Sequence, residues 1–240
     1  NPSLFKDMSF NYLQDTVQIA GVARFPLIME VAPTSAFQSI ADFIAFAKAN
    51  PGKLNMGSSG NGSSPHLAGE LFKAMAGINI VRVNYKGTGS ALNSLASGEV
   101  QLSFPSAGSV MPHLRAGRVR ALAVTSAQPS ALAPDLPTVT ESGLPLVRFG
   151  WLGFCGAAGT PQPIVALLNR QINAIVKAPD YRDMIEKAGS IPLSSTPEEL
   201  AKILTDTYEQ TVKISQEFGL QQHPDAGGAG KRQHEVQGGG

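Results

Sequence analysis

The sequence predicts an α/β fold in which short strands alternate with helices. Between Leu54 and Val124 one unit recurs: an apolar strand, a loop of Gly, Ser and Thr, and an amphipathic helix that ends at glycine. Units of this length connect strands through right-handed crossovers, which produces a parallel sheet. A fourth strand, Val119–Val124, is expected to close the series.

The three units share one layout, and each helix stops at a glycine, a common helix terminator. The expected strands are 54–58, 80–84 and 100–104, the expected helices are 65–76, 90–97 and 109–116, and the stops are Gly77, Gly98 and Gly117.

The flanking segments add further strands and helices. The apolar run Thr16–Ala32, broken at Phe25-Pro26, indicates one or two buried strands, and Ser39 is the expected cap of a helix. A proline-rich connector ends at Pro145. After it we expect a strand at 147–154, a helix from Thr160-Pro161, a helix over 180–189 and a last helix capped by Thr196 that reaches about Phe218.

Composition excludes several classes of function. The 240 residues carry a formal net charge of +1 and show no basic block outside the C-terminal segment, so nucleic-acid binding is not expected. No apolar run is long enough to predict a membrane span. A single cysteine, Cys155, allows neither an internal disulfide nor a cysteine metal cluster.

The two ends are interpreted separately from the fold. The chain starts with Asn1 rather than Met, so we interpret the N-terminus as processed or truncated. The glycine-rich, polar segment 221–240 has no apolar periodicity and is expected to be a disordered tail.

The strand-to-helix loops are the expected ligand site. In an open parallel sheet, ligands bind outside the carboxyl ends of the strands. The loop 57–64 contains only Gly, Ser and Asn and leads into Pro65, while Thr88-Gly89-Ser90 and, more weakly, Ser106 repeat the arrangement. Helix N-termini bind carboxylate, phosphate or sulfate through backbone N–H groups. Each loop alone also fits simple helix capping, but the set predicts an anion site.

Known nucleotide motifs do not fit this loop. Ser63-Ser64 stands where a phosphate loop needs Lys followed by Ser or Thr, and Pro65 replaces the third glycine of a dinucleotide fingerprint. Ser59 does not lie in a G-x-S-x-G elbow. The sequence therefore predicts no cofactor, no metal and no catalytic residue.

Other side chains keep two interpretations each. His66 and Glu70 share a helix face and could ligate a metal, or His66 could donate to a ligand or cap a loop. Cys155 is either a small core residue or a nucleophile, and Lys86 is either a solvated surface residue or a contact for an anion. Tyr85 either packs in the core or contacts the ligand, and Trp151 either packs at a hinge or stacks on the ligand. His113 lies near a helix end, where a solvated role or an interaction with the helix dipole is expected.

Six segments in order along the chain carry a pattern that is specific when they are taken together. They are 1–5 (NPSLF), 57–72 (GSSGNGSSPHLAGELF), 85–89 (YKGTG), 120–125 (RALAVT), 136–145 (LPTVTESGLP) and 158–161 (AGTP). This pattern resembles the Bug-type substrate receptors of tripartite tricarboxylate transporters, over almost the whole chain up to about Leu220.

The resemblance implies a bilobed, type II periplasmic-binding-protein-like fold with two parallel-sheet α/β domains and a hinge. Residues 1–35 and 146–220 would form domain 1, which would lack its N-terminal βαβ segment and expose apolar faces, and 36–145 would form domain 2. It also implies a monomeric periplasmic receptor that binds a small organic carboxylate, a di- or tricarboxylate or an aromatic acid, and presents it to membrane transporter subunits without inserting into the membrane.

The resemblance also assigns the site. The carboxylate loop falls on Ser59–Ser64 with His66 following, and Thr88 lies in the companion loop. Members often carry an aspartate where this chain has Pro105, which favours plain organic acids over amino acids. The candidate ligand-binding residues are Ser58, Ser59, Gly60, Asn61, Gly62, Ser63, His66, Thr88 and Ser106.

Two other classes of function stay open at this point. A ligand-sensing regulatory domain shares the bilobed organisation, although no helix-turn-helix or basic segment supports it. An enzyme on the same scaffold would need a nucleophile, base or metal set that these residues do not supply.

Overall fold

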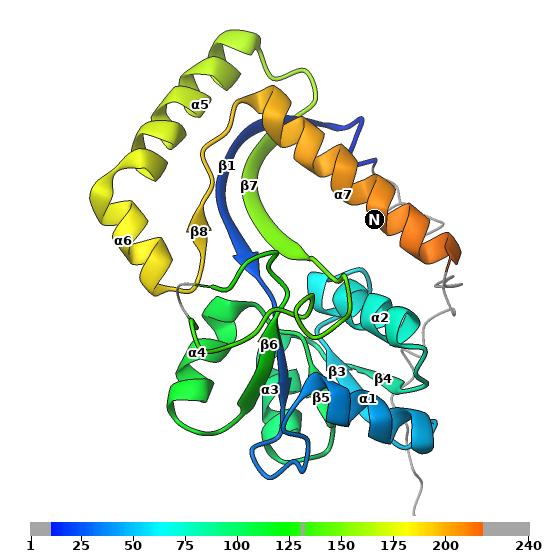
Figure 1. Cartoon of the computed structure of the whole chain (residues 1–240). Helices are drawn as coiled ribbons and strands as arrows, with labels where there is room; N and C mark the ends of the chain where they lie inside the picture. The colour runs from blue at the N-terminus through cyan, green and yellow to red at the C-terminus, as the bar shows by residue number, and fades with distance from the viewer. Residues whose placement is uncertain (1–10, 131–132, 218–240) are drawn as a thin grey trace, which may run out of the picture.

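Two β-sheets, one in each lobe, organise the molecule (Figure 1). The computed structural model describes residues 11–130 and 133–217. Within that part of the chain, a three-stranded sheet has the order β7-β1-β8, and a five-stranded sheet has the order β4-β3-β5-β2-β6. The expected bilobed α/β fold is therefore confirmed. The segments 1–5 and 221–240, singled out in the sequence, lie outside the described residues.

The second lobe contains the repeated strand-loop-helix units. Its elements in chain order are β2 (Ile28–Val31), α1 (Ile40–Ala49), β3 (Asn55–Ser58), α2 (Ser64–Ala76), β4 (Val81–Asn84), α3 (Thr88–Ala96), β5 (Leu102–Ser103), α4 (Ala107–Arg115) and β6 (Arg120–Val124).

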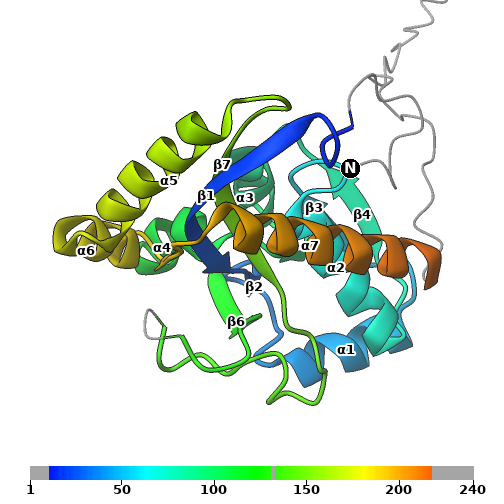
Figure 2. The ribbon, with the colours of Figure 1, turned by 90° about the horizontal axis from the view of Figure 1, so that it is seen from above.

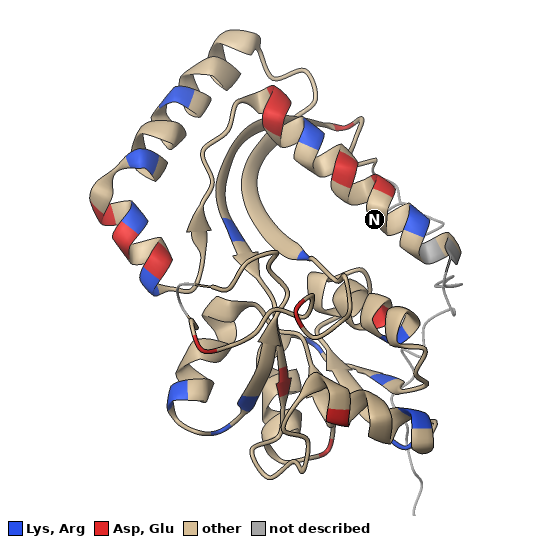
Figure 3. Cartoon of the chain, in the orientation of Figure 1, with Lys and Arg blue, Asp and Glu red and all other residues tan. Residues whose placement is uncertain are grey.

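The first lobe is assembled from two distant parts of the sequence. Its elements are β1 (Thr16–Pro26), β7 (Phe149–Ala157), α5 (Gln162–Lys177), α6 (Pro179–Lys187), β8 (Ile191–Pro192) and α7 (Pro197–Glu217). Both α5 and α7 pack on β1, and they lie on either side of it in the view from above (Figure 2). Basic and acidic residues are mixed along α6 and α7 (Figure 3).

The prediction of two parallel sheets is wrong in part. β3 pairs in parallel with β4 and β5, but β2 lies between β5 and β6 and is antiparallel to both. β2 follows β1 directly from the other lobe, so no crossover helix forces it into the common direction. In the first lobe, β1 pairs antiparallel with β7 and β8. Strand pairing thus places Ile28–Val31 in the five-stranded sheet, although the expected first domain extended to residue 35.

Local signals located the helix starts. The Ser39 hydroxyl accepts the Asp42 N–H, and at α7 the Glu199 carboxylate accepts the Thr196 N–H while Thr196 Oγ1 accepts the Glu199 N–H. The α7 cap is reciprocal, whereas at α1 the Asp42 carboxylate accepts the Gln38 N–H; both caps involve the residues that the sequence predicted. Among the described helices, none combines the length and the apolar character that a membrane crossing requires.

Two apolar layers hold the five-stranded sheet. Phe43, Phe72 and Phe104 are fully buried on the α1/α2 side, with ring centroids 6.1 Å and 5.6 Å apart along this series. The α3/α4 side has its own core around Leu92, Leu95 and other apolar residues. With both faces covered, the carboxyl ends of β3, β4 and β5 are fixed relative to one another, and so are the loops that follow them.

Thr125 joins the two segments that cross between the lobes. Its N–H donates to Leu27 O (2.9 Å) and its hydroxyl accepts the Leu27 N–H (2.9 Å), while the same hydroxyl donates to Arg148 O (2.7 Å) and Thr125 O accepts the Arg148 N–H (2.9 Å). Thr125 is fully buried. One residue therefore links the β1–β2 crossing to the strand segment that leads into β7.

The lobes also meet where the end of α6 contacts the start of α4. A Cβ on Gly108 would collide with the Ala188 carbonyl, and a Cβ on Gly189 would lie 2.7 Å from Gly108 N. Gly189 has a φ of +84°, a conformation that glycine adopts without strain. This contact consists of main chain on both sides, and it needs glycine at both positions.

The first lobe exposes apolar side chains, as the sequence predicted. Leu152 and Phe154 on β7 are each more than half exposed. The exposed set continues on the neighbouring helices with Ile164, Leu167, Leu168, Ile175 and Met184. Strand and helix faces of this kind ordinarily pack against another layer.

Replacing Thr125 with valine tests the junction. Valine keeps the shape of threonine but leaves the Leu27 N–H and the Arg148 carbonyl without their hydroxyl partner, so we expect a loss of about 1–3 kcal/mol in the free energy of unfolding. Chemical denaturation measures it. Thr125→Ser retains the hydroxyl and is the control; equal losses in both variants would contradict this role.

Replacing Gly108 with alanine tests the contact between α4 and α6. In an unobstructed helix, Gly→Ala stabilises by up to about 1 kcal/mol, and Gly89→Ala, where a Cβ has no neighbour within 4 Å, is expected to do so. Gly108→Ala is expected to destabilise by about 1–3 kcal/mol and to increase the radius of gyration measured by X-ray scattering. A stabilised Gly108→Ala variant would show that the lobes do not meet there.

Candidate functional site

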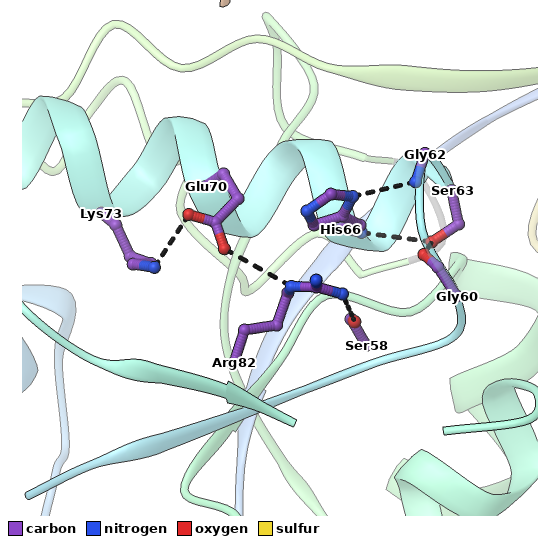
Figure 4. A network of polar contacts seen from close by, with 8 residues as sticks. All are labelled: Ser58, Gly60, Gly62, Ser63, His66, Glu70, Lys73 and Arg82. Carbon is purple, nitrogen blue, oxygen red and sulfur yellow. Dashed lines mark hydrogen bonds and ion pairs between the residues drawn. The ribbon is translucent and has the colours of Figure 1, made fainter. Parts of the chain in front are cut away.

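The loop after β3 is folded around the start of α2 (Figure 4). Ser63 is the N-cap of α2: its hydroxyl accepts the His66 N–H (3.3 Å) and donates to Gly60 O (2.8 Å). Gly60 and Gly62 have φ values of +121° and +74°, which favour glycine. The loop can therefore double back on itself, and the first N–H groups of the helix are left without intrahelical acceptors.

His66 supports this loop from inside the helix. Its Nδ1 accepts the Gly62 N–H at 2.9 Å, and the residue is only 6% exposed. Burial, together with the positive charges of Arg82 and Lys73, lowers the pKa of His66 from 6.5 to about 4. The imidazole is thus neutral near pH 7, and since Nδ1 is an acceptor, the ring proton is on Nε2.

Three charged side chains lie next to His66. Glu70 pairs with Lys73 (2.8 Å) and more loosely with Arg82 Nε (3.8 Å), and an Arg82 N–H donates to the Ser58 hydroxyl (3.4 Å). These contacts neutralise Glu70, which is mostly buried. Because Glu70 is paired, none of these three side chains places an unpaired negative charge beside the loop. The loop also lies at the N-terminal end of α2, where the helix dipole is positive, and this combination favours an anion.

The metal alternative for His66 and Glu70 gains no support. His66 binds the loop backbone and Glu70 binds two cations. Across the described residues, no group of three or more His, Cys, Asp or Glu is arranged to hold a metal ion.

Thr88 lies at the start of α3, beside the first loop. The Tyr85 N–H donates to Ser58 O (2.8 Å), and a Cβ on Gly57 would lie 3.6 Å from the Tyr85 ring. The N-cap of α3 is Gly87, which has no side chain that could accept a hydrogen bond from the helix. The N–H groups in the first turn of α3 therefore have no capping side chain. The structure therefore brings the starts of α2 and α3 together at one edge of the sheet.

Ser106 has a different neighbourhood. It is the N-cap of α4, and its hydroxyl lies 2.7 Å from the Ser109 hydroxyl. The first turn of this helix meets the end of α6 through Gly108. Helix α4 thus begins at a contact between lobes, whereas Ser59–Ser63 and Thr88 are partly exposed and Asn61 is exposed. Ser58 is buried, and its hydroxyl accepts a hydrogen bond from Arg82.

Arg82 is the residue that sequence reasoning missed. It lies on β4, opposite Met56 of β3, and so reaches the loop from the neighbouring strand. An arginine inside a short apolar strand (VRVN) was the available signal.

The other candidates are distributed over the fold. Trp151 Nε1 donates to Thr207 of α7 (3.1 Å), and Lys86 is exposed. Cys155 is exposed and its sulfur lies 3.3 Å from the Tyr12 hydroxyl. Burial, with the contact to Cys155, raises the pKa of Tyr12 to about 12. His113 lies in the last turn of α4.

Sequence comparison decides the family. The family model described as "Tripartite tricarboxylate transporter family receptor" matches residues 1–220 of this chain. The chain belongs to this family. The resemblance to Bug-type receptors is confirmed by BugT of Bordetella pertussis, which is 31% identical over 90% of this chain, and a UPF0065 protein of Pseudomonas sp. is 34% identical over 86% of it.

Solved structures of similar proteins have the same fold. The structure of R. palustris Rpa4515 with adipate has a TM-score of 0.86 and 30% identity, covering 90% of this chain and 73% of that one. The periplasmic binding protein BugD has a TM-score of 0.85 and 26% identity, covering 92% of this chain and 75% of that one. The chain spans 62% of the Pseudomonas relative and 67% of BugT.

The low pKa of His66 predicts acid sensitivity. The folded state disfavours the protonated ring, so its contribution to stability is complete above pH 6.5 and is lost as the pH falls towards 4, by about 3 kcal/mol in total. Denaturation curves between pH 7 and pH 4 should show this loss for the wild type relative to His66→Gln.

Comparison with matched variants isolates the His66 contribution. Glu30 is buried, and burial raises its pKa, so it acts in the opposite direction; it is present in both proteins and cancels. Parallel curves for the wild type and His66→Gln would rule out a buried neutral His66.

Proposed function

We propose that this chain is the ligand-binding part of an extracytoplasmic solute receptor that binds a small organic carboxylate and delivers it to a secondary transporter in the membrane. The observation that carries the proposal is the paired start of α2 and α3, where backbone N–H groups, a neutral His66 and the guanidinium of Arg82 surround one loop. The family relative with adipate supports a carboxylate as the ligand.

The chemistry of this edge suits a carboxylate. A carboxylate oxygen accepts hydrogen bonds from N–H groups at a helix start and is stabilised by the helix dipole. Ser59–Ser64 supply hydroxyl and backbone donors, and the polar contacts of His66 and Ser63 hold these donors in place before a ligand arrives. Preorganised donors bind with less loss of conformational entropy.

The charge balance favours a plain acid over an amino acid. An amino acid also carries an ammonium group, which requires an anionic partner. Glu70 is occupied by Lys73 and Arg82, and Pro105 stands where family members often carry an aspartate. We therefore expect mono-, di- or tricarboxylates without an amino group, a receptor role without catalysis, and a periplasmic location.

Binding is tested by titrating the chain with succinate, adipate, citrate and glutamate. At 100 times its dissociation constant, a ligand raises the free energy of unfolding by about 2.7 kcal/mol, which is a shift of several degrees in the melting temperature. We expect such a shift with at least one of the first three acids and none with glutamate. A cooperative melt that none of the three acids moves would contradict the proposal.

Replacing Ser63 with alanine tests the location of the site. It removes the α2 cap and the hydrogen bond to Gly60, so we expect about 1 kcal/mol less stability without ligand and about tenfold weaker carboxylate binding by calorimetry. Ser97→Ala, at the exposed C-terminal end of α3, is the matched control and should leave affinity unchanged. Unchanged affinity in Ser63→Ala would place the ligand elsewhere.

A further inference from the structure

A cavity of about 920 Å³ opens between the lobes, away from the carboxylate loop. None of the candidate residues 58–63, His66, Thr88 and Ser106 lines it. The first lobe contributes Arg24, Pro26, Phe149, the last turns of α6, Ser190 and Ile191, and the second lobe contributes Arg115 and the segment 126–130. Its volume is typical of sites for small organic molecules.

The lining is basic on balance. Three basic and two acidic side chains line the cavity, and Lys187 is paired with Asp183 at 2.6 Å. Arg24 of β1 and Arg115 at the end of α4 supply guanidinium groups from opposite lobes. Guanidinium groups bind carboxylates through two parallel hydrogen bonds, so an anion is the favoured occupant.

The same cavity offers an apolar wall. Pro26, Phe149 and Ile191 line it, and the guanidinium carbon of Arg24 lies 5.5 Å from the centre of the Phe149 ring. This places a cation beside an apolar wall, which suits a ligand that combines an apolar body with a negative charge.

We propose that this cavity is a second ligand site, for a small organic anion with an apolar body such as an aromatic carboxylate. It is separate from the loop at α2, and the two arginines recognise the charge of the ligand while Phe149, Pro26 and Ile191 contact its body. Because the lining comes from both lobes, the site is complete only in one relative arrangement of the lobes.

The test is a calorimetric titration with benzoate and with benzamide, which has the same ring without the charge. We expect the wild type to bind benzoate and to bind benzamide at least tenfold more weakly. Arg24→Gln and Arg115→Gln should each weaken benzoate binding about tenfold, because each removes a charge-assisted hydrogen bond.

A control variant tests whether the effect belongs to the cavity. Arg118→Gln removes a neighbouring exposed arginine that does not line the cavity, and it should bind benzoate as the wild type does. The proposal is overturned if benzoate does not bind at millimolar concentration, or if Arg24→Gln and Arg115→Gln both keep wild-type affinity for benzoate.

Discussion

The hydrogen bonds of Thr125 are the constraint on which the arrangement of the lobes depends. Two chain segments pass between the lobes, and their backbones meet at this buried residue. A buried N–H or C=O group without a partner is costly, so the crossing segments are held in one register rather than merely packed together. The cavity beside Arg24 and Arg115 is lined by the segments that flank this junction, including Pro26, Ser126 and Phe149.

The carboxylate loop depends on a different part of the molecule. Aromatic and aliphatic layers on both faces of the five-stranded sheet fix the ends of β3 and β4, and the glycines at 60 and 62 allow the loop to turn back onto His66. In the proposed site, selectivity for anions would come mainly from main-chain donors, with Arg82 close by. Such a site would accept acids of different length, since the donors would bind the carboxylate and not the carbon chain.

Local features of the sequence were sufficient for much of the fold. Ser39 and Thr196 cap helices through residues three positions away, and Gly77 ends α2 in the left-handed conformation, so short-range spacing predicts them. The loop 57–64 could be predicted for the same reason, because its Gly, Ser and Asn residues are consecutive in the sequence. Arg82 reaches the loop only through the pairing of β3 with β4, and β2 enters the sheet antiparallel because it arrives from the other lobe. Such relations join distant parts of the chain, and spacing in the sequence does not encode them.

The contact between Gly108 and Gly189 has an evolutionary consequence. Since only backbone atoms meet there, the contact does not depend on a pair of complementary side chains that would have to change together. This contact itself places no demand on the surrounding side chains of α4 and α6, and the fit persists as long as both positions remain glycine. A side chain at either position would break the contact. One substitution is therefore enough to remove this contact between the lobes, and the contact cannot be altered in small steps.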